Sequence, residues 1–269
     1  MTLNFTKMHG CGNDYIFLPP EQSDIPNPSE LSRTLSGRRF SVGSDGLVLI
    51  TGDRVGGFGM RIFNSDGSEG ATCGNALRCA ALFLLRRGYA DVPEFEINTA
   101  SGSRRVTVKD NGRVTVGMGK ASLIADRSGL PMINRPLLAG GVRYRMTAIS
   151  VGNPHQVIFV PDPAAVPLDK IGGELEHSLP GGINTEFVKM TGKSSMIMRV
   201  YERGSGETLS CGSGASAAAA VAVMSGRADP DTPVEVTLPG GKLSVTVSGE
   251  LDITLTGSAV FVYDGRLEI

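Results

Sequence analysis

The pattern of hydrophobic and polar positions predicts a chain built mainly from β-strands. Short runs rich in β-branched residues, or with apolar and polar positions in alternation, are typical of strands, and Gly and Asn between the runs mark turns. The predicted strands cover residues 46–51, 58–64, 94–99, 104–109, 113–118, 143–148, 156–160, 186–190, 195–202, 233–238, 243–248 and 251–256.

Helices are few, and four segments predict them: residues 28–40, 74–88, 168–179 and 212–225. Gly88 and Gly226 stand where a helix ends in a left-handed residue. The run 217–222 holds only Ala and Val, so its helix is expected to be buried with strand backbones packed closely around it. Each half of the chain is therefore predicted to be a β-rich unit around one main helix, which is an α+β fold.

The two halves repeat each other. Met60-Arg61-Ile62-Phe63-Asn64 matches Met198-Arg199-Val200-Tyr201-Glu202 at an offset of 138, and the same offset relates Cys73 to Cys211. A period of about half of 269 residues is too long for a solenoid, and it predicts two homologous domains. The linker is expected at residues 119–136, where the strand pattern stops.

Composition narrows the possible functions. The formal net charge is −1, with charges of both signs scattered along the chain, so no basic surface is expected for nucleic acid. The N-terminus lacks the pattern of a signal peptide, and the longest apolar stretches are too short to span a membrane. We therefore expect a soluble, cytoplasmic protein. Four cysteines are too few for a disulfide scaffold, and they are expected to be free thiols.

Two of these cysteines predict chemistry, because Cys73 and Cys211 each precede a predicted helix. A helix N-terminus offers unpaired N–H groups and a positive dipole, which hold a carboxylate and favour a thiolate. Inverting an α-carbon requires a base on one face and an acid on the other, and two thiols, one of them ionised, can fill these roles. The backbone amides expected around the substrate carboxylate are those of Gly74, Asn75, Gly212 and Ser213.

The sequence holds neither a GxxxxGK[ST] loop nor a GxGxxG motif between a strand and a helix, and the two-thiol chemistry needs no pyridoxal phosphate. We therefore expect no cofactor and no metal, and a small amino acid as the substrate.

Several motifs together resemble the signatures of the diaminopimelate epimerase family: MHGCGNDY, FNSDGSE followed by CGN, SVGNPH, GGIN followed by a strand, and VYERGSGETLSCGSGA. Their order covers nearly the whole chain. The resemblance implies two pseudo-symmetric domains, each a mostly antiparallel, barrel-like sheet around a central helix. It places residues 1–118 and 259–269 in one domain and residues 119–258 in the other. It also implies a homodimer and a cofactor-independent conversion of LL- to meso-diaminopimelate for lysine biosynthesis.

The resemblance also assigns roles at matching positions. Cys73 and Cys211 would be the acid and base, assisted by Glu202 and His155, with Glu202 also receiving the substrate ammonium. The residues implied to bind the distal, unreactive end are Asn64, Asn153, Asn184 and Arg203, with Asn13 as a further contact. An arginine and several amides suit a second zwitterion, because they supply a cation for its carboxylate and carbonyls for its ammonium.

One position departs from the family pattern. Gly46 lies opposite Asn184 in the internal repeat, where some family members carry a glutamine that contributes to the site. We expect that side-chain contact to be lost here, or replaced by water or backbone.

Other residues in these motifs have structural interpretations. Cys79 lies about 240° around the helix from Cys73 and is expected to be a small buried residue, and Cys11 a packed loop thiol. Glu69 and Glu207 are predicted to cap the two cysteine-bearing helices.

Two alternatives stay open. The first is a racemase of the same fold that acts on proline, hydroxyproline or histidine; proline-type enzymes typically follow the first cysteine with Gly-His, whereas this chain has Gly74-Asn75. The second is a zinc or thiol-redox protein, which is disfavoured because the sequence has no CxxC motif and its three histidines lack ligand spacing.

Overall fold

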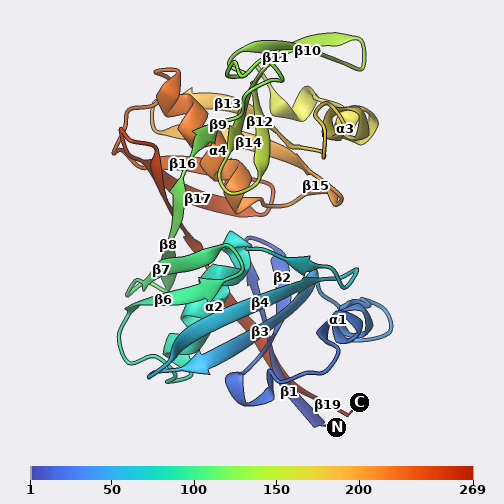
Figure 1. Cartoon of the computed structure of the whole chain (residues 1–269), viewed down its shortest axis with the longest axis vertical. Coiled ribbons are helices and arrows are strands. Elements are labelled where there is room, and N and C mark those ends of the chain that lie inside the picture. The colour runs from blue at the N-terminus through green and yellow to red at the C-terminus, as the bar shows by residue number, and fades with distance from the viewer. Residues whose placement is uncertain (1, 269) are drawn as a thin grey trace. The chain divides into compact units, whose positions relative to one another are not determined.

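The computed structural model describes residues 2–268 and divides into two compact units. The first unit comprises Met1–Gly117 and Thr256–Ile269, and the second comprises Met118–Leu255. In Figure 1 the last strand, in red, runs beside the first strand, in blue, within the first unit. Among the described residues, no helix has the length and apolar character needed to cross a membrane.

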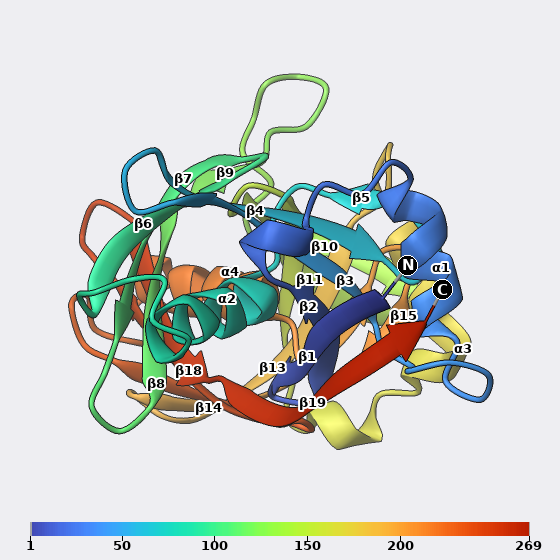
Figure 2. The ribbon, with the colours of Figure 1, turned by 90° about the horizontal axis from the view of Figure 1, so that it is seen from below.

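The first unit is a mixed but mostly antiparallel sheet around one helix. Its strands are β1 (Thr2–Gly10), β2 (Asn13–Leu18), β3 (Gly46–Asp53), β4 (Gly57–Asn64), β5 (Glu69–Gly70), β6 (Glu94–Thr99), β7 (Gly102–Val108), β8 (Arg113–Lys120) and β19 (Val260–Glu268). Strand β1 pairs antiparallel with β2 and β19, which run side by side with it in Figure 2. Strand β2 is parallel to β3, β3 antiparallel to β4, and β4 parallel to β6. Helix α2 (Gly74–Arg86) packs against β1, β2 and β7, and helix α1 (Pro28–Ser36) against β3 and β4.

The second unit repeats this order. Its strands are β9 (Ser122–Leu123), β10 (Arg135–Ala139), β11 (Val142–Ser150), β12 (Pro154–Phe159), β13 (Asn184–Gly192), β14 (Ser195–Glu202), β15 (Gly206–Thr208), β16 (Val234–Leu238), β17 (Gly241–Val247) and β18 (Asp252–Ser258), the last continuing into the first unit. Here β12 is parallel to β13, β13 antiparallel to β14, and β14 parallel to β16. Helix α4 (Gly212–Met224) packs against β12, β13 and β17, and α3 (Leu168–Glu176) corresponds to α1. The predicted α+β fold of two pseudo-symmetric units is therefore confirmed.

The ends of α2 and α4 share one motif. Gly88 and Gly226 have φ of 74° and 69°, and the N–H of the next residue bonds back across the last turn, from Tyr89 to Leu84 O and from Arg227 to Ala222 O. Helix α4 is buried as predicted, since Ala217, Ala218, Ala219, Ala220 and Ala222 have no exposed surface.

Some predicted boundaries are wrong. Helix α1 ends at Ser36 rather than at residue 40, because Gly37 turns to extended backbone (φ −60°, ψ 101°). The strand pattern does not stop throughout 119–136, because β9 pairs there with β11 and β10 begins at Arg135. Strands β1, β2 and β19 were not predicted, and within β1 the buried Lys7, which forms an ion pair with Asp14 at 2.7 Å, interrupts the apolar pattern.

Candidate active site

Cys73 is the N-cap residue of α2 and is partly buried. Its Sγ donates to Asn13 Oδ1 at 3.5 Å and accepts from the hydroxyl of Tyr15, also at 3.5 Å. Both partners come from β2, which packs against α2. We call these residues, with Asn75 and Arg78, the Cys73 half-site.

A buried arginine fixes the first turn of α2. Arg78 has no exposed surface, and its nitrogens donate to Asn75 Oδ1 at 2.7 Å, to Ser258 O at 3.1 Å and to Gly74 O at 3.3 Å. Burial lowers the pKa of Arg78, although the nearby cysteine side chains oppose this effect. Because Arg78 can only donate, Asn75 presents its oxygen to Arg78 and its Nδ2 to Asn13 Oδ1, at 3.2 Å.

Cys211 is the N-cap residue of α4 and is buried. Its Sγ accepts from the backbone N–H of Gly214 at 3.3 Å and lies 3.4 Å from Ser213 Oγ. Burial raises the pKa of the Cys211 thiol well above its usual value, and the carboxylates of Glu202 and Glu186 raise it further. Both effects favour the thiol form of Cys211, and they oppose the preference of the helix N-terminus for a thiolate. We call Cys211, Ser213, Glu202, His155 and Glu186 the Cys211 half-site.

A fully buried pair lies beside this thiol. His155 Nδ1 and Glu186 Oε1 are 2.6 Å apart, and neither side chain is exposed. The other ring nitrogen of His155 lies 3.0 Å from Asn153 Oδ1. Among residues 2–268, Glu186 Oε2 has no hydrogen-bond partner. A Cβ at Gly214 would lie 2.6 Å from Glu186 Oε1, so the first turn of α4 packs directly on this carboxylate.

Glu202 ends β14 and lies next to Cys211. Burial raises the pKa of Glu202, while hydrogen bonds from Thr208 and Cys211 and the charge of His155 oppose the rise. A carboxyl group with a raised pKa beside a thiol is suited to proton transfer. His155, Glu202 and Cys211, singled out from the sequence, are therefore neighbours in the second unit.

The residues expected at the distal end of the substrate already bond within the chain. Asn184 donates from Nδ2 to Pro154 O at 2.8 Å and accepts from the Arg203 N–H at 2.9 Å, so it ties the start of β12 to the end of β14. The exposed Arg203 side chain donates to Gly181 O at 2.9 Å and borders a pocket of about 470 Å³ lined by residues 176–182. In the first unit, Asn64 donates to Ser68 Oγ at 2.9 Å.

Close approach of the backbone explains Gly46. A Cβ there would lie 2.2 Å from Phe63 O and 3.1 Å from Tyr15 Cε1. Glycine is needed because any side chain would collide with a carbonyl, and the ring of Tyr15 fills the adjacent space.

The capping roles predicted for Glu69 and Glu207 are wrong. Glu69 forms an ion pair with Arg61 at 2.8 Å, and Glu207 forms the matching pair with Arg199 at 2.7 Å. Each pair joins neighbouring strands, β4 to β5 and β14 to β15, because the glutamates precede their helices as short strand segments.

The other two cysteines are packed, as predicted. Cys79 has no exposed surface and burial raises the pKa of its thiol to about 12. Cys11 is 3% exposed, and its Sγ lies 3.7 Å from Ser258 Oγ. Within residues 2–268, no group of three or more His, Cys, Asp or Glu side chains is placed to hold a metal ion.

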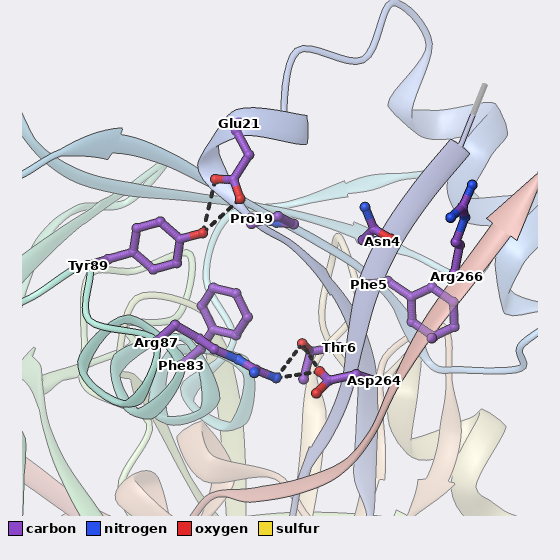
Figure 3. Close-up of a pocket in the computed structure, with 11 residues that line it drawn as sticks. Asn4, Phe5, Thr6, Pro19, Glu21, Phe83, Arg87, Tyr89, Asp264 and Arg266 are labelled. Carbon is purple, nitrogen blue, oxygen red and sulfur yellow. Dashed lines mark hydrogen bonds and ion pairs between the residues drawn. The ribbon is translucent and has the colours of Figure 1, made fainter.

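The first unit has a pocket of about 500 Å³, which is shown in Figure 3. Its charged side chains are already paired, Arg87 with Asp264 and Thr6, and Tyr89 with Glu21. Neither Cys73 nor Cys211 lines it, so it is not the candidate active site.

Sequence reasoning missed three residues of the half-sites: Tyr15, Arg78 and Glu186. Tyr15 could have been found from the repeat, because it stands 140 residues before His155, the offset that also relates Gly12-Asn13 to Gly152-Asn153. Arg78 carried a signal too, as a charge inside an otherwise apolar helix. Glu186 had none, since a single glutamate at the start of a strand is usually exposed.

Known proteins agree with the motifs. The family model described as "Diaminopimelate epimerase" matches residues 5–124 and 147–262. A diaminopimelate epimerase of Methanococcus maripaludis is 39% identical over 280 residues, covering 99% of this chain and all of the relative. One of Synechococcus elongatus is 39% identical over 280 residues and covers 100% and 99% of the two chains.

Solved structures share the fold. A predicted epimerase of Pseudomonas aeruginosa superposes with a TM-score of 0.74 at 17% identity, covering 99% of both chains. A hydroxyproline epimerase of Agrobacterium vitis gives 0.74 at 15% identity, covering 99% of this chain and 92% of that one.

Proposed function

Since this chain belongs to the diaminopimelate epimerase family and is therefore an epimerase, we propose that it interconverts LL- and meso-diaminopimelate by proton transfer between two thiols. The observation that carries the proposal is that each unit places one cysteine at the N-cap of a 13-residue helix, Cys73 on α2 and Cys211 on α4. The substrate follows the relatives' name, and the reaction would serve lysine biosynthesis.

The two thiols take different roles, acid and base, because their charged surroundings differ. Cys211 is held as a thiol by burial and by Glu202 and Glu186, so it is the acid when Cys73, as a thiolate, removes the α-proton. The roles exchange in the reverse direction, which couples the titrations of the two groups. Glu202 and His155 assist at the Cys211 half-site, and Glu202 also receives the reacting ammonium.

Backbone amides would bind the reacting carboxylate, where charge accumulates as the proton leaves. These amides belong to Gly74, Asn75, Gly212 and Ser213. At the unreactive end, Arg203 would pair with the second carboxylate. The amides proposed for the second ammonium are those of Asn64, Asn153 and Asn184, with Asn13 as a further contact.

Replacing each cysteine tests the two-thiol mechanism. Cys73→Ser and Cys211→Ser are each expected to lower kcat for LL-diaminopimelate by about 10²–10⁴-fold, because one face loses its acid–base group. Cys79→Ser is the control, since Cys79 is a buried thiol on the same helix as Cys73. Turnover near the control rate in either variant would contradict the mechanism.

The absence of a cofactor is tested by isotope exchange. Purified protein in deuterated water is expected to incorporate deuterium at the α-carbon during turnover without any addition, because the thiols exchange their protons with solvent. Activity that appears only when pyridoxal phosphate is added would contradict this proposal.

The substrate is tested by a panel of LL-diaminopimelate, histidine, proline and hydroxyproline, following inversion at the α-carbon. We expect turnover only of diaminopimelate, because Arg203 would pair with a second carboxylate that the other amino acids lack. Turnover confined to an amino acid with one carboxylate would assign the chain to a racemase of the same fold.

We also propose that the protein forms a homodimer. Light scattering on the purified protein is expected to give twice the chain mass of 28.2 kDa, and a monomer mass at micromolar concentration would contradict this.

A further inference from the structure

A tyrosine hydroxyl contacts the sulfur of Cys73. Tyr15 lies on β2, is 5% exposed, and donates from its hydroxyl to Cys73 Sγ at 3.5 Å. Burial raises the pKa of Tyr15 well above its usual value, and the neighbouring Cys73 adds to the rise. The phenol therefore keeps its proton, and remains a donor, up to a higher pH than an ordinary tyrosine does.

The internal repeat gives Tyr15 a counterpart. Tyr15 pairs with Gly46 across the parallel strands β2 and β3, and His155 pairs with Asn184 across the parallel strands β12 and β13. Each aromatic side chain thus takes the same place in its unit. The two environments differ, because Gly46 leaves room for the larger tyrosine ring, whereas His155 meets Glu186.

Two neighbours of Cys73 favour opposite protonation states. Asn13 Oδ1 can only accept, so it favours the thiol; its orientation is fixed because its Nδ2 donates to Asp45 at 2.7 Å and Asn75 donates to its oxygen. The Tyr15 hydroxyl donates to the sulfur and so stabilises the thiolate.

We propose that the Tyr15 hydroxyl is a further catalytic group, which stabilises the Cys73 thiolate from the position that His155 holds in the second unit. The inference rests on the proposed function, in which Cys73 is one of the two acid–base thiols. Tyr15 transfers no proton in this scheme. It holds the thiolate by a hydrogen bond while Cys73 takes the α-proton, and the same hydrogen bond remains to the thiol afterwards.

The test measures the ionisation of Cys73 without turnover. In a Cys211→Ser background, the rate of Cys73 alkylation by iodoacetamide is followed against pH, with peptide mass mapping to identify the modified thiol. Adding Tyr15→Phe is expected to move the midpoint of this profile to higher pH by about one unit, because a hydrogen bond to a charged group is lost. An unchanged midpoint would overturn the proposal.

Matched variants separate the hydroxyl from the ring. Tyr89→Phe removes another hydroxyl of the first unit, one bonded to Glu21, and is expected to leave the midpoint in place. Replacing Tyr15 with 3-fluorotyrosine keeps the ring and strengthens the donor, so the midpoint moves to lower pH. If Tyr15→Phe fails to fold, the fluorotyrosine protein alone decides, and a midpoint that does not fall overturns the proposal.

Activity then separates this inference from the proposed function. With Cys211 intact, Tyr15→Phe is expected to lower kcat about tenfold near neutral pH and to move the rising limb of the pH–rate profile upward. If Cys73→Ser is inactive but Tyr15→Phe has the wild-type profile, only the inference fails. If Cys73→Ser stays active, the two-thiol mechanism itself fails.

Discussion

At the scale of single residues, the two cysteines share a helix position but not a charge environment. Arg78, a fully buried cation, interacts with Cys73, whereas the carboxylates of Glu186 and Glu202 interact with Cys211. A cation favours a thiolate and an anion favours a thiol. The internal repeat therefore places two sulfurs at equivalent positions. Three charged side chains that the repeat does not share, Arg78, Glu186 and Glu202, make the two thiols chemically different.

Glu186→Gln tests the acidic side of this asymmetry. Removing the charge while keeping the shape is expected to lower the pKa of Cys211, so that its thiolate forms at lower pH. Thiolate absorbance against pH, measured in a Cys73→Ser background, reports this change. Glu207→Gln is the control, because Glu207 is already paired with Arg199. A Cys211 profile that Glu186→Gln leaves unmoved would show that the carboxylate has no electrostatic role.

Asp14 is expected to make the free energy of unfolding depend on pH in the acid range. Burial alone would raise the pKa of Asp14, but the bonds from Arg38 and Lys7 outweigh it and lower the pKa from 3.8 to about 2. The pKa of Asp14 is lower in the folded chain than in the unfolded chain. Its contribution to the free energy of unfolding is therefore complete above about pH 4 and is lost as the pH falls towards 2. Partial exposure limits it to about 1–2 kcal/mol.

Asp14→Asn is therefore expected to unfold in urea at a lower midpoint than the wild type at pH 7. The difference between the urea midpoints of the wild type and the variant is expected to narrow as the pH is lowered through 3. Glu250→Gln, which removes an exposed ion pair with Lys120, is expected to change the free energy of unfolding by less than about 0.5 kcal/mol. A difference in urea midpoint that stays constant between pH 7 and pH 3 would contradict the lowered pKa of Asp14.

At the scale of elements, two adjacent glycines of α3 are expected to respond oppositely to alanine. A Cβ at Gly172 would lie 2.0 Å from the ring of Tyr201, whereas one at Gly173 would meet nothing within 4 Å. Gly173→Ala is expected to raise the free energy of unfolding by about 0.5–1 kcal/mol, because alanine favours the helix. Gly172→Ala is expected to lower it by about 1–3 kcal/mol through overpacking. Urea unfolding of the two variants checks both signs, and equal effects would refute the packing described for Tyr201.

The starts of the helices could be predicted from the sequence, and several strands could not. Helices α2 and α4 begin and end within two residues of the prediction, because a small-residue run and a terminal glycine are local signals. Strand β1 was not predicted because the buried Lys7, which forms an ion pair with Asp14 of β2, interrupts its apolar pattern. A contact between strands leaves no trace in the hydrophobic pattern of either one.

The residues of the candidate site, like the elements of the fold, could be predicted from the sequence only in part. The cysteines were found because they recur at one offset. The family resemblance supplied Asn13, Glu202 and His155, and the helix starts supplied Asn75 and Ser213. Glu69 and Glu207 were misread because their arginine partners lie on a neighbouring strand, eight residues before each of them. Glu186 was missed because only the folded chain brings it to His155.

At the scale of the whole molecule, the first unit depends on strand β19. Strand β19 pairs with β1 along its length, and Arg87 and Thr6 both bond to Asp264. Ending the chain after residue 258 would leave one edge of β1 unpaired.

Hydrogen exchange tests this dependence. In the truncated protein, amides of the first unit are expected to lose most of their protection, while those of β13 and α4 in the second unit keep theirs. Wild-type protection throughout β1 and β2 in the truncated chain would contradict the prediction.

The pairing of β1 with β19 also sets an order for synthesis. Every residue of the second unit leaves the ribosome before β19 does, so the second unit has all its strands before the first unit does. The N-terminal segment must wait with one edge of β1 unpaired until β19 appears. Chaperones that guard exposed strand edges are therefore expected to bind the nascent chain at β1, and to leave once β19 has paired with it.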